Sequence, residues 1–182
     1  EWALDAAPYD NKLKAMRQYC YGQLAFRQRR YADAIQAYKE AIQFDPDWAL
    51  PYNSIGVAYA RQKRWTKVLE WCSRAKRRDT DWAFPYLNMG WAFYNLKRYD
   101  EAEQEYKMGA QLAPTRPTVY CHLNCIHEKK GRLFDSLEMA EKAMEVAQQN
   151  PDRWQTQIKD LQKRIERLKR KVGLYDIEVT DE

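Results

Sequence analysis

A sixteen-residue phrase that occurs twice constrains the fold of this chain more than any other feature. The stretch DPDWALPYNSIGVAYA begins at Asp45, and DTDWAFPYLNMGWAFY begins at Asp79, thirty-four residues later. Half of the sixteen aligned residues are identical. Self-similarity at a fixed offset of this length indicates stacked supersecondary units, each of which completes its core only against its neighbours.

The same offset aligns small and aromatic residues along most of the chain. Where two antiparallel helices cross, a small residue lets the backbones approach closely, and an aromatic ring fills the space beside it. The aligned columns are Gly22, Gly56 and Gly90; Ala34, Val68 and Ala102; Ala41, Ala75 and Gly109; and Tyr31, Trp65 and Tyr99. Apolar spacings of three and four predict paired helices near 15–28, 31–44, 48–62, 65–77, 82–96, 99–112, 117–130 and 133–149.

On these residues the chain resembles the tetratricopeptide repeat family. The match is carried by Gly22, Ala34, Ala41 and Pro46, by Gly56, Tyr59 and Ala75, and by Gly90, Ala102 and Pro114. The resemblance covers about residues 13–148 and implies an all-α, right-handed solenoid of four helix-turn-helix repeats. The expected repeats are 13–46, 47–80, 81–114 and 115–148. In the last one Asn124 replaces the expected glycine and Ser136 the expected alanine, so the pattern defines its packing least.

Segments of different character flank the repeats. Residues 1–12 repeat the Ala-to-Pro spacing that ends a repeat, and two interpretations stay open: the end of a preceding repeat, or a frayed leader. Residues 151–173 combine basic residues with an apolar seam of Trp154, Ile158, Leu161, Ile165, Leu168 and Val172. We predict that this helix caps the last repeat, with a dimerisation helix as the alternative. Residues 174–182 form an acidic tail.

The resemblance further implies a concave groove, because in this family the first helix of each repeat faces it. The partner-binding residues expected there are Met16, Tyr19, Phe26, Leu50, Asn53, Val57, Phe84, Leu87, Asn88, Trp91, Tyr94 and Asn95. Aromatic residues at helical spacing usually indicate core. Residues 82–94, however, are apolar all round except at Asn88, and a large exposed apolar patch is uncommon without a partner. We therefore expect the groove to bind an apolar or amphipathic peptide or helix of a partner protein.

One type of client is argued against. Family members that hold the acidic C-terminus of heat-shock chaperones clamp its carboxylate with Lys, Asn and Arg side chains. The corresponding positions here are Tyr19, Gln23, Ser54, Phe84 and Asn88, and none of them is a cation. A carboxylate-clamp chaperone client is therefore not expected.

A basic edge gives an alternative function. Cations recur at the turn inside each repeat: Arg27, Arg29, Arg30, Arg61, Lys63, Arg64, Lys97, Arg98, Lys129, Lys130 and Arg132. With the basic 151–173 helix, such an edge would dock on nucleic acid or an anionic membrane. The simpler interpretation is a row of solvated helix ends, where cations are favoured by the helix dipole.

The remaining reactive residues point away from catalysis. The segment CHLNCIH offers Cys121, His122, Cys125 and His127, but one helix cannot aim all four at one metal ion. No nucleophile motif or phosphate-binding loop is present, so we expect no enzyme, no metal and no cofactor. The chain should act as a scaffold, adaptor or chaperone-like module that is monomeric or weakly self-associating. Four cysteines inside helical patterns favour a reducing compartment such as the cytoplasm, although the sequence names no compartment.

Overall fold

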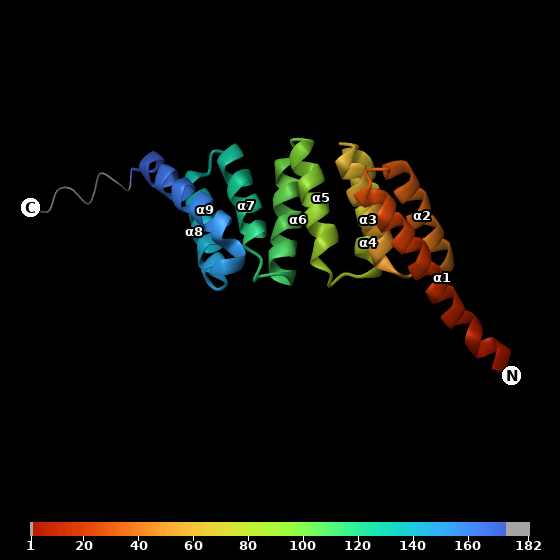
Figure 1. The fold of residues 1–182 in the computed structure, drawn as a ribbon. Coiled ribbons are helices and arrows are strands. Elements are labelled where there is room, and N and C mark those ends of the chain that lie inside the picture. The colour runs from red at the N-terminus through yellow and green to blue at the C-terminus, as the bar shows by residue number, and fades with distance from the viewer. Residues whose placement is uncertain (1, 174–182) are drawn as a thin grey trace, which may run out of the picture. The chain divides into compact units, whose positions relative to one another are not determined.

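The computed structural model describes residues 2–173, with side chains from Asp10 onward. Within that range the chain forms nine α-helices and no strand (Figure 1). They are α1 (Trp2–Arg27), α2 (Tyr31–Phe44), α3 (Ala49–Arg61), α4 (Trp65–Arg78), α5 (Ala83–Asn95), α6 (Tyr99–Leu112), α7 (Pro117–Lys129), α8 (Leu133–Gln148) and α9 (Pro151–Lys171). The all-α repeat fold of the solenoid class is confirmed. None of the described helices has an apolar run long enough to span a membrane.

The helices belong to two compact units, Glu1–Leu96 and Lys97–Glu182. In unit 1, α1 pairs with α2 and α3 with α4, while α5 packs against α4 and α3. In unit 2, α7 pairs with α8, α6 packs against α7, and α9 packs against α8. The expected third repeat, 81–114, therefore gives its first helix to unit 1 and its second to unit 2.

Small residues sit where the helices of a pair cross, as their column predicts. A Cβ atom added at Gly22 would overlap the ring of Tyr38, and one at Gly56 would overlap Cys72 Sγ. Tyr38 and Cys72 are themselves almost fully buried, and burial raises the pKa of the Cys72 thiol to about 12. The close approach of α1 to α2 and of α3 to α4 thus depends on glycine.

A tyrosine in the first turn of α3, α5 and α7 fixes the loop that precedes each helix. In each case the phenol donates a hydrogen bond to the carbonyl oxygen six residues earlier, and the period of thirty-four residues is kept. The three bonds join Tyr52 to Pro46 (2.9 Å), Tyr86 to Thr80 (2.9 Å) and Tyr120 to Pro114 (3.2 Å).

In the last repeat, two buried polar residues replace the small pair. Asn124 and Ser136 are both fully buried. Asn124 Nδ2 donates to Ser136 Oγ (2.9 Å) and to the Ser136 carbonyl oxygen, while Ser136 Oγ lies 3.3 Å from the Asn124 carbonyl oxygen. The departure from the family pattern is therefore partly compensated, because Asn124 Nδ2 and Ser136 Oγ find partners on the facing helix, while Asn124 Oδ1 is buried without one among the described residues.

The N-terminal and C-terminal helices compare differently with what the sequence predicts. At the N-terminal end, α1 runs unbroken from Trp2 to Arg27 with no turn near residue 12, and the two interpretations of residues 1–12 remain predictions. At the other end, α9 turns its seam toward α8: Leu161 and Leu168 are buried, and Trp154, Ile158 and Ile165 are partly buried against it. This is the packing expected of a cap. The acidic tail, 174–182, lies outside the described residues.

Candidate functional site

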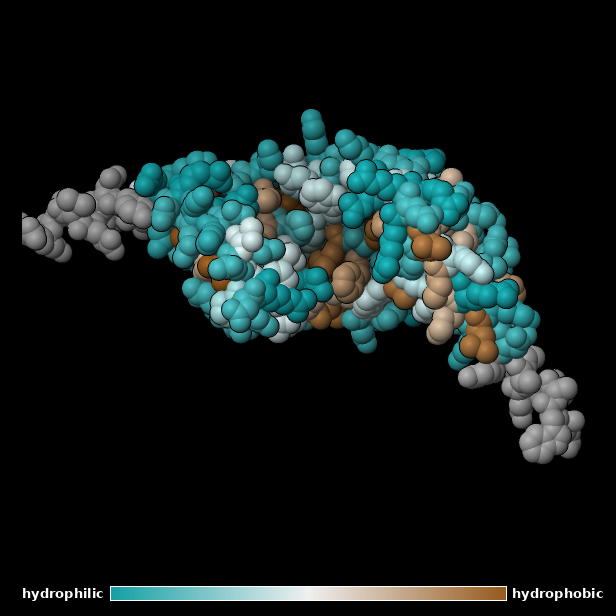
Figure 2. Space-filling view, in the orientation of Figure 1, coloured by the Kyte–Doolittle hydropathy of each residue, from teal (hydrophilic) through white to brown (hydrophobic). Residues whose placement is uncertain are grey.

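The candidate groove belongs entirely to unit 1. Its expected residues lie on α1 (Met16, Tyr19, Phe26), α3 (Leu50, Asn53, Val57) and α5 (Phe84, Leu87, Asn88, Trp91, Tyr94, Asn95). The face of the molecule in Figure 2 shows hydrophobic side chains reaching the surface in the region of α5, with hydrophilic side chains around them.

Aromatic rings dominate the exposed face of α5. Phe84 and Trp91 each keep 41% of their surface exposed. Because they are seven residues apart, they lie on the same face of the helix. The Trp91 ring stacks on Tyr94, with centroids 5.7 Å apart and planes inclined by 7°. On its other side, Trp65 of α4 approaches Trp91 edge-on at 6.5 Å. These contacts fix the orientation of Trp91 while part of its ring remains at the surface.

The wall between α1 and α3 is polar but uncharged. Tyr19 Oη lies 3.3 Å from Ser54 Oγ, and Gln23 Nε2 donates to the same Tyr19 oxygen. A cavity of about 180 Å³ opens beside this network, lined by Gln23, Phe26, Tyr38, Ser54 and Val57. Residues from the two helices therefore combine a hydrogen-bonding edge with apolar surface.

The asparagines of the groove have structural partners. Asn53 is only 6% exposed, and its Oδ1 accepts a hydrogen bond from Asn88 Nδ2 (2.9 Å). Asn95 Nδ2 donates to the Trp91 carbonyl oxygen at 2.8 Å. Asn53 therefore ties α3 to α5 beneath the surface and presents almost no area to a partner, whereas Asn88 and Asn95 are half-buried.

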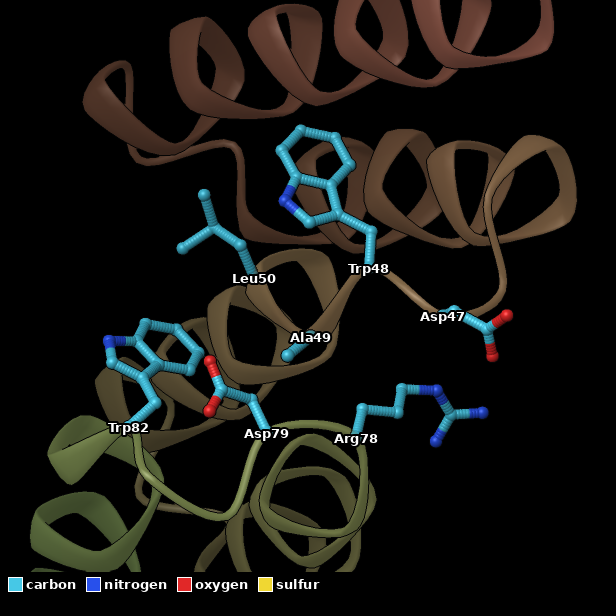
Figure 3. Close-up of a pocket in the computed structure, with 7 residues that line it drawn as sticks. All are labelled: Asp47, Trp48, Ala49, Leu50, Arg78, Asp79 and Trp82. Atoms are coloured by element: carbon cyan, nitrogen blue, oxygen red, sulfur yellow. The ribbon is translucent and has the colours of Figure 1, made fainter. Parts of the chain in front are cut away.

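A pocket that the sequence analysis missed lies where α3 and α5 begin (Figure 3). Its volume is about 480 Å³, and it is lined by Asp47, Trp48, Ala49, Leu50, Arg78, Asp79 and Trp82. Trp48 and Trp82 lie on either side of Leu50, which is one of the groove residues. The signal for this pocket is the Asp-Trp pair in both copies of the repeated phrase, since the two indoles occupy the same place before successive helices.

The basic edge is not uniform. In unit 1 the edge cations Arg27, Arg29, Arg30, Arg61, Lys63 and Arg64 are all exposed, and among described residues only Arg30 forms an ion pair, with Asp33 (3.1 Å). In unit 2, by contrast, Lys130 and Arg132 both bind Glu103, which is buried. The cations of the edge are therefore mostly without ion-pair partners in unit 1, whereas in unit 2 some of them belong to an internal ion-pair network.

The residues of CHLNCIH are packing residues of unit 2. The His122 ring stacks on Tyr106 with centroids 4.8 Å apart, and burial lowers the pKa of His122 to about 4. Burial likewise raises the pKa of the Cys121 thiol to about 11. Both groups are neutral at physiological pH. Within the part of the chain that the structure describes, no three His, Cys, Asp or Glu side chains are placed to hold a metal ion.

Two family models match the chain: "TPR repeat" over residues 22–63 and "Tetratricopeptide repeat" over residues 85–116. Among solved structures, MamA matches with a TM-score of 0.72 and 20% identity, covering 76% of this chain and 81% of that one. The first TPR of Spaghetti (RPAP3), bound to the HSP90 peptide SRMEEVD, matches with a TM-score of 0.64 and 23% identity, covering 66% and 95%. The TPR domain of OM64 from Arabidopsis matches at 0.63 and 22%, covering 65% and 98%. These identities establish the fold alone. Curated protein sequences gave no match.

Proposed function

The chain belongs to the tetratricopeptide repeat family and is a protein–protein interaction module, and we propose that it binds an apolar or amphipathic segment of a partner protein in the groove of unit 1. Members of this family are generally non-catalytic. The observation that carries the proposal is the pair of aromatic rings on α5, Phe84 and Trp91, each 41% exposed on one helix face.

The geometry around these rings suits a helical or extended apolar peptide. The stacked Trp91 and Tyr94 rings give a rigid apolar surface that loses little side-chain entropy on binding. The pocket between Trp48 and Trp82 would take one large apolar side chain of the same ligand, because Leu50 connects it to the groove. Binding would combine one anchored side chain with contact along α5.

The chemistry of the α1–α3 wall argues against an acidic chain terminus as the ligand. A bound carboxylate needs a cationic or strongly donating site to replace its hydration. At the positions where relatives place the clamp, Tyr19, Gln23 and Ser54 instead bind one another, and Asn88 donates to Asn53. The HSP90 peptide held by the RPAP3 domain is therefore not the ligand that we propose here.

A peptide-display selection on the intact chain tests the proposal. We expect enriched peptides to be apolar or amphipathic, and Trp91→Ala combined with Phe84→Ala to weaken their binding by at least about thirtyfold, since one buried aromatic anchor contributes about 2 kcal/mol or more. The matched control is Phe134→Ala, which removes a ring that is 67% exposed on α8 in unit 2. Circular dichroism must show the same helix content in each variant.

Two results would overturn the proposal. Equal losses in the groove and control variants would mean that binding does not use α5, and unfolding of the groove variant, or of Trp91→Ala alone, would mean that Trp91 is core.

The alternative, docking of the basic edge on nucleic acid or anionic lipid, rests on the unpaired cations of unit 1. It predicts binding that falls steeply with salt, whereas peptide binding by an apolar groove should change little between low and moderate salt. A third possibility is self-association in which the tail segment LYDIEV of one chain lies in the groove of another, and light scattering of a chain ending at Gly173 tests it.

A further inference from the structure

A second open pocket lies on unit 1, and none of its lining residues is one of the groove residues. It has a volume of about 510 Å³ and is lined by Lys39 and Ile42 of α2, Tyr52 of α3, and Trp71, Arg74, Arg77 and Arg78 of α4. Four of these seven residues are cations and none is acidic. Such a pocket differs from the basic edge, whose cations all lie at the turns between helices.

Aromatic rings hold the cations of this pocket in place. Tyr52 and Trp71 lie side by side with centroids 6.1 Å apart. Arg78 Cζ stands 3.7 Å from the centroid of the Tyr52 ring, and Arg74 Cζ stands 4.5 Å from that of Trp71. Lys39 Nζ approaches Trp71 from α2 at 5.9 Å. Cation–π attraction therefore orders side chains that would otherwise be mobile.

Hydrogen bonds also hold the Arg78 side chain in place, and they leave some of its N–H donors available. Its Nε donates to the Pro46 carbonyl oxygen and its Nη1 to the Arg74 carbonyl oxygen (3.0 Å). The neighbouring Arg77 is exposed and makes no hydrogen bond or ion pair with any described residue. The ordered guanidinium of Arg78 and the unpaired guanidinium of Arg77 together give the pocket several N–H groups that can point at a single anion.

The charge of the pocket is not balanced by the protein. Glu70 lies nearby and already binds Lys67 (2.8 Å) and Arg74 (2.9 Å). Asp47 and Asp79 line the adjacent pocket together with Arg78, but neither is within ion-pair distance of it. The dipole of α4 accounts for Arg77 and Arg78 at its C-terminal end, but it does not account for Lys39, which is on α2. The positive charges of the lining residues repel one another. A bound anion would relieve that repulsion.

We propose that this pocket binds a phosphate group, either on a phosphorylated side chain of a partner or on a small phosphate ester. A dianion with three terminal oxygens carries more charge and offers more acceptor sites to forked guanidinium donors than a chloride or a single carboxylate does. The volume leaves room for the group that carries the phosphate. Its lining residues come mostly from α2 and α4, and the proposal does not depend on peptide binding in the groove, although Arg78 also lines the pocket between Trp48 and Trp82.

The test is a titration of the intact ¹⁵N-labelled chain, followed at the indole N–H of Trp71, whose signal is identified by its loss in Trp71→Phe. The probes are inorganic phosphate, N-acetyl phosphoserine amide and N-acetyl phosphotyrosine amide, with sodium acetate at equal ionic strength as the reference. We expect a saturable shift with the phosphates and not with acetate. Tighter binding of an ester than of inorganic phosphate supports a peptide or ester source, and equal binding supports recognition of the phosphate alone.

Matched variants separate a built site from general attraction. Lys39→Gln combined with Arg77→Gln removes two lining cations that make no ion pair, and should raise Kd at least about tenfold. Lys12→Gln combined with Arg17→Gln removes the same charge from exposed positions on α1 and should change Kd less than about twofold. Equal weakening in both pairs, or a shift with acetate as large as with phosphate, would overturn the proposal.

Discussion

Unit 1 and unit 2 are built from the same kind of helix pair, yet they use equivalent positions differently. On α5 of unit 1 the inner positions carry Phe84 and Trp91, which are large and partly exposed. Thirty-four residues later, on α7 of unit 2, the same positions carry Thr118 and Cys125. There, Arg164 of α9 donates to Cys125 Sγ at 3.3 Å. Unit 2 thus uses this face for its own last helix, whereas unit 1 presents aromatic surface.

The charges follow the same division. In unit 1 the edge cations and those of the phosphate pocket outnumber their carboxylate partners, so they remain available to an anion. In unit 2, Glu103 gathers Lys107 and Lys130 at 2.8 and 2.9 Å, together with Arg132. The difference agrees with the proposal that unit 1 carries recognition while unit 2 uses its charges internally, and three experiments can break or sharpen this comparison.

The largest effect should come from removing α9. A chain that ends at Asn150 exposes the apolar surface of α8 that Leu161 and Leu168 bury. Because truncating a single buried leucine costs about 2–5 kcal/mol, loss of the whole seam should unfold unit 2 or make the chain aggregate. Thermal unfolding followed by circular dichroism checks this. An unchanged melting curve would contradict the role of α9 as a cap and leave dimerisation as its role.

A smaller effect is expected from the carboxylate at the centre of unit 2. Burial opposes ionisation of Glu103, but hydrogen bonds from Lys107, Lys130 and Arg132 outweigh it and hold the pKa of Glu103 at about 2, below its ordinary value of 4.5. A folded pKa below the unfolded one stabilises the protein fully above about pH 5, and that contribution disappears as the pH falls toward 2. Glu103→Gln should therefore lower the free energy of unfolding at pH 7 by about 3 kcal/mol.

Urea denaturation of wild type and Glu103→Gln at several pH values measures this contribution. The difference between the two proteins should shrink steadily between pH 5 and pH 2. Glu101→Gln is the matched control, because Glu101 pairs with Arg98 at the exposed surface and should matter far less. A difference that does not depend on pH would mean that Glu103 acts through packing and not through its charge.

The fold could be predicted from the sequence because one physical pattern repeats. Gly22 and Gly56 mark helix crossings that admit no Cβ atom, so their spacing fixes where each pair begins. The start of the first helix was not predictable in the same way: an alanine and a proline at the right spacing do not end a helix unless a turn follows, and α1 continues through residues 2–27.

The polar and charged sites were harder to predict, since they depend on pairs that are distant in sequence. Asn124 and Ser136 each depart from the small-residue pattern, and only their positions on facing helices reveal that they hydrogen-bond to each other. The phosphate pocket could not be predicted from the sequence for the same reason. Lys39 and Arg74 both resemble solvated surface residues until α2 and α4 bring them to the same tryptophan, Trp71.

The smallest effect concerns the turns, where a lysine and a glycine occupy equivalent positions with positive φ. Lys63 in unit 1 and Gly131 in unit 2 are sixty-eight residues apart, which is two repeat lengths, and both have positive φ, 57° and 75°. Each turn closes with the equivalent backbone hydrogen bond, from Arg64 N to the Tyr59 oxygen (3.0 Å) and from Arg132 N to the His127 oxygen (2.9 Å). Glycine adopts this conformation without strain, whereas a side chain adds about 1 kcal/mol.

Lys63→Gly should therefore raise the free energy of unfolding by about 0.5–1 kcal/mol, and Gly131→Ala should lower it by about as much. A Cβ added at Gly131 meets no atom within 4 Å, so backbone strain is the only cost at that position. Lys63→Ala supplies the control, since it removes the charge of the lysine and keeps the strain. If Lys63→Gly and Lys63→Ala proved equally stable in urea, the lysine would be held in this conformation at no cost, and the turns of the two units would be equivalent after all.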